Sequence, residues 1–206
     1  MSMRTFDHTE DLSTKQRLCL FHGSSVKAED ALLIDYKDLT FEVLLENGVR
    51  VQNITTAGIG PQRLKSMGLE SADRLRSIGF DALYLADPRF ASEANAAFGS
   101  EAIRESYLRS ASDAVAISGT DAMGLLGITC LHLMEACAGA PTEAHAVLQQ
   151  LPLGTSLSGV PASVVLDTGL RKAALMQLGY SLSSVVSQTS ANARQLETLG
   201  FALFDR

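Results

Sequence analysis

The residues best placed to do chemistry lie around a glycine-rich turn in the first half of the chain. The stretch Gly58-Ile59-Gly60-Pro61 is followed closely by Arg63 and Lys65. Glycines let backbone N–H groups approach a ligand, and such groups beside cationic side chains are typical of phosphate contacts. A phosphate-binding site made of Gly58, Gly60, Arg63 and Lys65 is therefore one hypothesis.

The residues Gly58, Ile59, Gly60 and Pro61 resemble the hairpin of the helix-hairpin-helix family of DNA-binding elements. The resemblance implies nucleic-acid binding by a turn at 57–65. Gly68 departs from the family's pattern, because it stops the following helix too early. The net charge of −6 also disfavours binding to polyanions, which requires clustered Lys and Arg. Nucleic-acid binding is therefore kept as an alternative function.

Other candidate constellations do not match the spacing that catalysis or metal binding requires. Cys130, His132, Cys137 and His145 lack the short paired spacing of zinc ligands. The stretch 154–159 has serine where a hydrolase nucleophile turn requires its second glycine, and no strand is predicted before it. We predict no catalytic residue, no metal and no cofactor. A small-molecule enzyme of unknown class stays a second alternative.

The elements that would position these residues follow from a repeated unit. The segment 62–70 (QRLKSMGLE) aligns with 73–81 (DRLRSIGFD) at a period of eleven residues. The pattern places an apolar residue four positions before a glycine and another just after it. A glycine beyond a helix end adopts the left-handed conformation, and the two apolar residues then pack together. The pattern therefore predicts short helices that end at Gly68 and Gly79.

The same unit recurs in two runs, one in each half of the chain. Each run has a spacing of ten or eleven residues between its glycine positions; a single further copy surrounds Gly127. The glycine positions are 48, 58, 68 and 79 in the first run and 169, 179, 190 (a serine) and 200 in the second. Helices this short are unstable alone, so the units are expected to stack on their neighbours. Ser71 and Ser181 are predicted helix caps, and Gly60 with Pro61 is a predicted helix start.

These runs resemble arrays of very short helical repeats, punctuated by Gly-Phe or Gly-Tyr, in some bacterial, protist and large-virus proteins. The resemblance covers residues 48–81 and 165–204. It implies an interaction or structural role and brings no catalytic residues.

The predicted fold is all-α, with short stacked helices in solenoid-like repeats around a central helical block. The expected divisions are a flexible tail at 1–16, a first repeat region at 17–90, a central block at 91–151 and a second repeat array at 152–206. In the central block we expect Ser92 to cap 93–98 and Ser100 to cap a helix through Ala111. A buried helix is expected at 121–138, followed by one that Thr142 caps.

Composition describes a globular chain without a membrane or export signal. Apolar residues make up 46% and charged residues 19% of the 206 residues. The polar, acidic N-terminal segment predicts neither a signal nor a transit peptide, and no stretch is apolar enough to span a bilayer. Three cysteines in apolar surroundings suit an intracellular, reducing compartment such as the cytoplasm.

Two surfaces are predicted to bind a protein partner or a second copy of the chain. Arg63, Lys65, Arg74 and Arg76 recur at the repeat interval and are expected to form a row. Residues 136–206 carry only 8 of the 40 charged side chains, which favours docking of a charge-poor face that contains Gln177, Tyr180, Ser184 and Gln188. The sequence thus predicts a non-enzymatic scaffold for protein–protein interaction or a structural component of a larger assembly.

Overall fold

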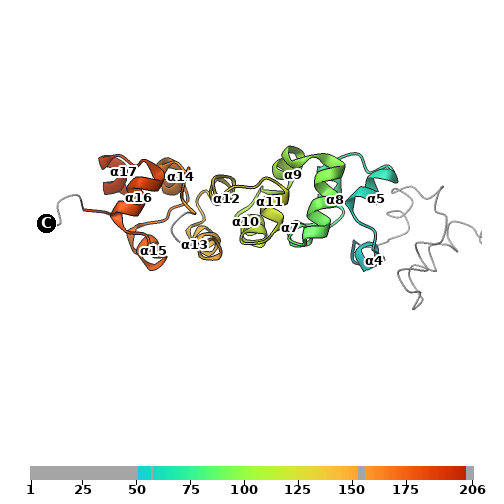
Figure 1. The fold of residues 1–206 in the computed structure, drawn as a ribbon, viewed down its shortest axis with the longest axis horizontal. Coiled ribbons are helices and arrows are strands. Elements are labelled where there is room, and N and C mark those ends of the chain that lie inside the picture. The colour runs from blue at the N-terminus through green and yellow to red at the C-terminus, as the bar shows by residue number, and fades with distance from the viewer. Residues whose placement is uncertain (1–50, 57, 153–155, 203–206) are drawn as a thin grey trace, which may run out of the picture. The chain divides into compact units, whose positions relative to one another are not determined.

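A computed structural model describes residues 51–56, 58–152 and 156–202, and these residues form short helices joined by turns (Figure 1). They contain no strand, so the all-α prediction is confirmed for this part of the chain. The predicted tail at 1–16 and the repeat copy around Gly48 lie outside the described residues. The chain divides after Phe80 into two compact units, 1–80 and 81–206.

The described part of the first unit contains three short helices. They are α4 (Val51–Thr56), α5 (Pro61–Ser66) and α6 (Ala72–Ser77). Pro61 occupies the first position of α5 after Gly60, and the Ser71 side chain accepts a hydrogen bond from Arg74 N at the start of α6. Both predicted helix starts are therefore confirmed.

The second unit packs its helices through neighbouring pairs. Helix α10 contacts α7, α12 and α13, helix α8 contacts α7, α9 and α11, and helix α14 contacts α12 and α17. The helices are α7 (Ala82–Leu85), α8 (Pro88–Phe98), α9 (Ser100–Tyr107), α10 (Ala111–Ile117), α11 (Ala122–Leu125), α12 (Cys130–Ala136), α13 (Pro141–Gln150), α14 (Ala162–Asp167), α15 (Lys172–Gln177), α16 (Leu182–Thr189) and α17 (Ala193–Leu199).

The predicted helix stops are confirmed in both units. The turn residues have left-handed backbone, with φ of 102° at Gly68, 95° at Gly79, 85° at Gly179 and 92° at Gly200. In the Schellman arrangement, the N–H group that follows the turn residue donates to the carbonyl five residues earlier. This hydrogen bond forms at five of the predicted copies: Ile59 to Ile54 (3.0 Å), Leu69 to Leu64 (3.1 Å), Ile128 to Met123 (2.8 Å), Tyr180 to Leu175 (2.9 Å) and Phe201 to Leu196 (2.9 Å).

The apolar residues on either side of each turn form the core. Leu64, Leu75 and Phe80 are fully buried, and Leu69 is 1% exposed. Burial of a side chain of this size stabilises a fold by about 1.5–3 kcal/mol. Each copy of the repeat spans only about two helical turns, so its local hydrogen bonds alone cannot hold it folded. The buried apolar residues supply the missing stability.

Two turns of the second array differ from the predicted form. At Gly169, the Thr168 hydroxyl donates to Val165 O (2.7 Å) and accepts from Leu170 N (3.2 Å), so it bridges the two groups that a Schellman turn joins directly. At Ser190 (φ 52°) the N–H donates to Val186 O (3.1 Å). The buried residue of that copy is Val185, and Val186 is 40% exposed. The predicted register there, with Val186 packed inward, is wrong.

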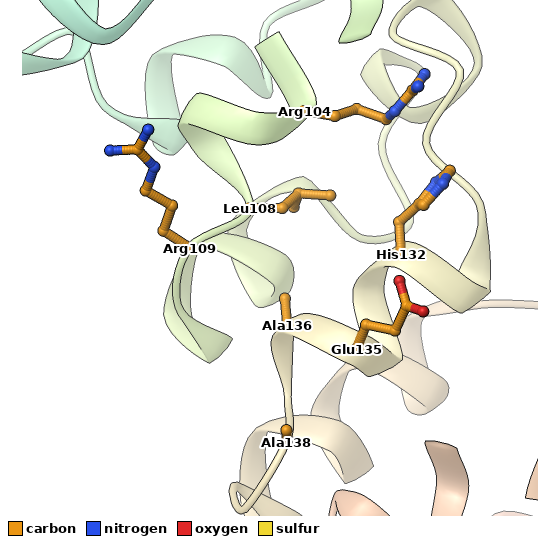
Figure 2. Close-up of a pocket in the computed structure, with 7 residues that line it drawn as sticks. All are labelled: Arg104, Leu108, Arg109, His132, Glu135, Ala136 and Ala138. Carbon is orange, nitrogen blue, oxygen red and sulfur yellow. The ribbon is translucent and has the colours of Figure 1, made fainter. Parts of the chain in front are cut away.

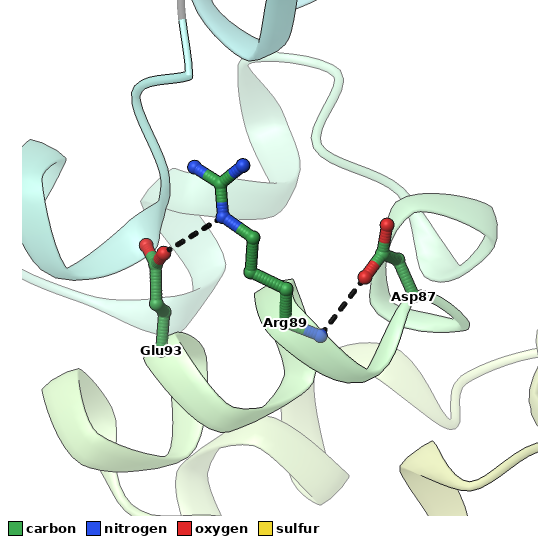
Figure 3. A network of polar contacts seen from close by, with 3 residues as sticks. All are labelled: Asp87, Arg89 and Glu93. Carbon is green, nitrogen blue, oxygen red and sulfur yellow. Dashed lines mark hydrogen bonds and ion pairs between the residues drawn. The ribbon is translucent and has the colours of Figure 1, made fainter.

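Helix starts in the central block differ from the prediction. Helix α8 begins after Asp87, whose Oδ1 accepts from Arg89 N (2.9 Å), with Pro88 at its first position; Ser92 lies inside the helix (Figure 3). Asp-Pro is a stronger start signal than an isolated serine, because aspartate caps and proline is already fixed near helical φ. Arg89 Nε also donates to Glu93 Oε1 (3.3 Å), one turn along.

Other expected boundaries shift for similar local reasons. Ser100 is the first residue of α9 and not its cap, and Ala111 begins α10, because Ser110 accepts from Asp113 N (3.3 Å) and caps a new helix. Thr142 lies within α13, which begins at Pro141. The expected single helix at 121–138 is two helices, α11 and α12, separated by a turn at Gly127 (φ 61°) where Ile128 N donates to Met123 O (2.8 Å).

Candidate functional site

The predicted basic surface rests on two helices of the same construction. Arg63 and Lys65 lie in the last turn of α5, and Arg74 and Arg76 lie in the last turn of α6. Ser66 Oγ donates to Arg63 O (2.7 Å), and Ser77 Oγ donates to Arg74 O (2.8 Å) in the equivalent place. The repeat therefore extends to the side-chain hydrogen bonds at each helix end.

Exposure and partners separate these four cations. Arg63, Lys65 and Arg74 are exposed, whereas Arg76 is half-buried. The side chains of Arg63 and Arg74 make no hydrogen bond or ion pair with the described residues; Lys65 and Arg76 have interactions of their own. Cations near a helix C-terminus are favoured by the helix dipole, which explains their place without a ligand. Arg63 and Arg74 remain displayed to solvent, and their alignment in a row stays a prediction.

The predicted charge-poor face is covered in part by the chain itself. Gln177 is exposed, Ser184 and Gln188 are half-buried, and Tyr180 is only 3% exposed. The Tyr180 hydroxyl is hydrogen-bonded to Ser156 Oγ, and Gly159 N donates to Gln188 O (3.3 Å). The segment 156–160 thus returns against this part of the second array, and Tyr180 does not form part of an exposed binding face.

Three exposed residues near this face are large and apolar, which the sequence pattern does not predict. They lie on α15 and α16, where Met176 is 56%, Leu182 37% and Val186 40% exposed. Leu182 and Val186 are four residues apart and therefore lie on one side of α16. The wrong register at Ser190 hid this feature, because it assigned Val186 to the core.

At the described residues 58–65, two backbone N–H groups that the phosphate-binding hypothesis would use already have acceptors. Gly58 N donates to Thr55 O (3.0 Å) and Ile59 N donates to Ile54 O (3.0 Å). A phosphate would have to replace these hydrogen bonds, which close the end of α4. Helix α5 then ends at Ser66, after only six residues. The local structure is that of a helix stop followed by a helix start.

The described cysteines are thiols in apolar surroundings. Cys130 is half-buried and Cys137 is buried. Burial, with a smaller contribution from Cys137, raises the pKa of Cys130 to about 12, and burial with a smaller contribution from Glu143 raises that of Cys137 to about 11. Thiols with raised pKa values are poor nucleophiles and poor metal ligands near neutral pH. No group of three or more His, Cys, Asp or Glu side chains within the described segments is placed to hold a metal ion.

Two open pockets lie in the second unit. One, of about 430 Å³, lies beside the start of α13 and the start of α15 and includes His145, Arg171 and Gln177. The other, of about 480 Å³, lies between the end of α9 and α12 (Figure 2). Among the described residues, the groups with shifted pKa values are Cys130, Cys137 and Tyr180, and none of them lines either pocket.

The pocket at α9 and α12 brings together polar side chains that are far apart in the sequence. Arg104 and Arg109 come from α9 and the residues after it, and His132 and Glu135 come from α12. The sequence contained one local signal for it, because Thr129 and His132 have the spacing of a capping box. The approach of α9 to α12 had no such signal.

Comparisons with known proteins give no relative: no family model, no curated protein and no solved structure matches the chain. Within the described segments, every helix is too short or too polar to cross a membrane.

Proposed function

We propose that the protein is a non-enzymatic scaffold for protein–protein interaction, or a structural component of a larger assembly. Its short helices would stack in a solenoid-like arrangement of repeats. The observation that carries the proposal is the identical construction of α5 and α6: the same helix length, buried leucine, terminal serine hydrogen bond and displayed arginine. A fold that repeats a unit also repeats its outward side chains, and such rows are suited to extended partner surfaces.

The partner that best fits the first array is an acidic protein surface. Arg63 and Arg74 are exposed at equivalent positions, without partners among the described residues. Guanidinium groups pair with carboxylates through two parallel hydrogen bonds, which favours acidic side chains as their targets. Nucleic acid is the weaker candidate, because the net charge is −6 and the hairpin N–H groups of Gly58 and Ile59 are already used.

The test compares partner capture by two charge-matched variants of the full chain. One variant replaces Arg63, Lys65, Arg74 and Arg76 by Gln; the other replaces Arg109, Arg171, Lys172 and Arg194 by Gln. Each is expressed in the native source and purified with and without nuclease treatment. We expect one protein, in fixed stoichiometry, to copurify with the wild type and the second variant but not with the first.

Three other outcomes would contradict the proposal. Equal loss from both variants would show that the captured protein responds only to net charge. Copurified material that nuclease removes would favour the nucleic-acid alternative. A monomeric wild type without any partner would leave no role for a scaffold.

A further inference from the structure

The pocket between α9 and α12 has a fixed imidazole donor at one of its walls. His132 Nδ1 lies 3.1 Å from Thr129 N, and a backbone N–H can only donate. Nδ1 is therefore the acceptor, and the neutral ring carries its proton on Nε2. The same Nδ1 lies 3.1 Å from Thr129 Oγ1. These contacts hold the ring at the start of α12, and the Nε2–H group is left to donate elsewhere.

Arg104 supplies a second donor at the same pocket. It is half-buried, and its Nη1 lies 3.4 Å from the position that a Cβ on Gly127 would occupy. The guanidinium therefore rests against the Gly127 turn, where the absence of a side chain makes room. Its side chain has no hydrogen-bond or ion-pair partner within the described residues. In Figure 2, Arg104 and His132 extend toward the same edge of the pocket.

The other polar groups limit the charge of a ligand. Arg109 points to the opposite side in Figure 2, and its Nε donates to Glu105 O (2.9 Å). Glu135 lies one turn along α12 from His132 and lines the same pocket. A carboxylate at this place attracts cations and repels anions, and the repulsion is larger for a dianion than for a monoanion.

We propose that this pocket binds a carboxylate, held by the guanidinium of Arg104 and the Nε2–H group of His132. Two donors without acceptors of their own match the two oxygens of a carboxylate, and Glu135 disfavours a phosphate dianion. Leu108 and Ala136 line the pocket beside these groups and provide apolar contact for the carbon chain of the ligand. The carboxylate can belong to a small molecule or to an acidic side chain of a peptide.

The experiment is an NMR titration of the full chain at constant ionic strength, followed through the histidine ring nitrogens. The probes are sodium acetate, acetyl-glutamate amide, its glutamine counterpart and sodium phosphate. Without ligand we expect the His132 ring as the Nε2–H tautomer. Acetate and acetyl-glutamate amide should shift the Nε2 signal saturably, and acetyl-glutamine amide should not. Tighter binding of acetyl-glutamate amide than of acetate would identify an acidic peptide as the source; equal binding would identify a small carboxylate.

Four variants locate the site. Arg104→Gln should weaken carboxylate binding by about tenfold, since it removes a charge-assisted hydrogen bond. His132→Glu keeps an acceptor for Thr129 N at the third helical position, so the helix start is preserved, but it should abolish binding. Arg109→Gln removes the same charge from the same pocket and should have a much smaller effect. Glu135→Gln should strengthen binding.

The proposal is overturned by any of four results. These are the Nδ1–H tautomer at His132, no saturable shift with either carboxylate, equal weakening by Arg104→Gln and Arg109→Gln, and tighter binding of phosphate than of acetate. Because the first readout requires no ligand, a misplaced ring and a failure to bind are distinguished.

Discussion

The two repeat arrays share their turns but use their charged residues differently. In the first array (Ile54–Phe80), Arg63 and Arg74 are exposed at the ends of α5 and α6. In the second array (Val165–Phe201), Arg171 Nη1 donates to Leu170 O (2.7 Å), and Lys172 Nζ lies 5.9 Å from the centre of the Phe201 ring. Arg194, the third Lys or Arg residue of this segment, is exposed. In the first array, exposed arginines stand at equivalent positions of two consecutive copies, Arg63 and Arg74.

The arrays also differ in how strictly they keep the unit. Helices α5, α6, α14 and α15 each have six residues, whereas α16 has eight. The longer helix is followed by Ser190 in place of glycine, and its buried side chain is one position earlier than in the other copies. A helix rotates by about 100° per residue, so this shift turns a different side outward. The result is an exposed valine where the other copies have a core residue.

The largest losses of stability should come from truncation of the buried apolar residue that lies four positions before each turn glycine. Leu75→Ala and Leu175→Ala should each lower the free energy of unfolding by about 3 kcal/mol, because both side chains are fully buried. Val186→Ala should change it by less than about 0.5 kcal/mol, since this side chain is 40% exposed. The control is Val185→Ala, which we expect to cost about 2 kcal/mol. Urea denaturation measures all four changes. A larger loss of stability at Val186 than at Val185 would show that Val186 packs inward, as in the other copies.

The hydroxyl bridge at Gly169 is a special feature of the second array. Thr168 is fully buried, and Thr168→Val removes the group that joins Val165 O to Leu170 N. Leaving that N–H without an acceptor should cost about 1–3 kcal/mol. Thr168→Ser keeps the hydroxyl and should cost less. Thr168→Val keeps the γ-methyl group, which Thr168→Ser removes. If Thr168→Val cost nothing while Thr168→Ser lost stability, packing of the methyl group would be the stabilising contact and the bridge would contribute nothing.

Sequence reasoning succeeded where the structure is decided locally. The relation among Leu64, Gly68 and Leu69 lies within six residues, so left-handed glycine and its apolar contact could be inferred from order alone. The same rule applies at Gly127, but the apolar character of 121–138 favours one buried helix. The turn signal decided that case, because a left-handed glycine ends the helical hydrogen-bond pattern whatever the hydrophobicity.

Features that depend on distant contacts were beyond the sequence. Burial of Tyr180 follows from the return of 156–160, where Ser156 contacts a residue 24 positions away. The pocket of Arg104 and His132 requires α9 to lie near α12, and no local pattern encodes that approach. The basic residues of the first array occupy equivalent places in α5 and α6, and such an equivalence needs no tertiary information; their role in binding stays a prediction.

Replacement of the turn residue should lower the free energy of unfolding at Gly79 in the first array and raise it at Ser190 in the second. Gly79→Ala should cost about 1 kcal/mol, since alanine is strained in the left-handed region. A Cβ at this position would lie 3.8 Å from Val51 Cγ1, an ordinary contact, so strain and not a clash is the expected cause. Ser190→Gly should stabilise by up to about 1 kcal/mol, because it relieves the strain of serine at φ 52°. Thermal denaturation of the two variants is the measurement; a loss of stability in Ser190→Gly would contradict the assigned backbone.

The smallest effects should distinguish helix starts at equivalent places. Ser71 caps α6 through Arg74 N (3.2 Å), whereas Arg171 at the start of α15 makes no such bond. Ser71→Ala should lower the free energy of unfolding by about 1 kcal/mol, because it removes the cap of α6. Arg171→Ser should raise it by about 0.5 kcal/mol, because serine can accept from an unpaired N–H group in the first turn of α15. The gain is reduced by the loss of the hydrogen bond from Arg171 to Leu170 O. Amide hydrogen exchange in the first turns of α6 and α15 measures both effects locally, and Ser71→Asp, which keeps an acceptor, is the control. Slower exchange in α15 of Arg171→Ser would show that the second array kept an uncapped start where the first has serine; faster exchange would show that the contact with Leu170 outweighs a cap.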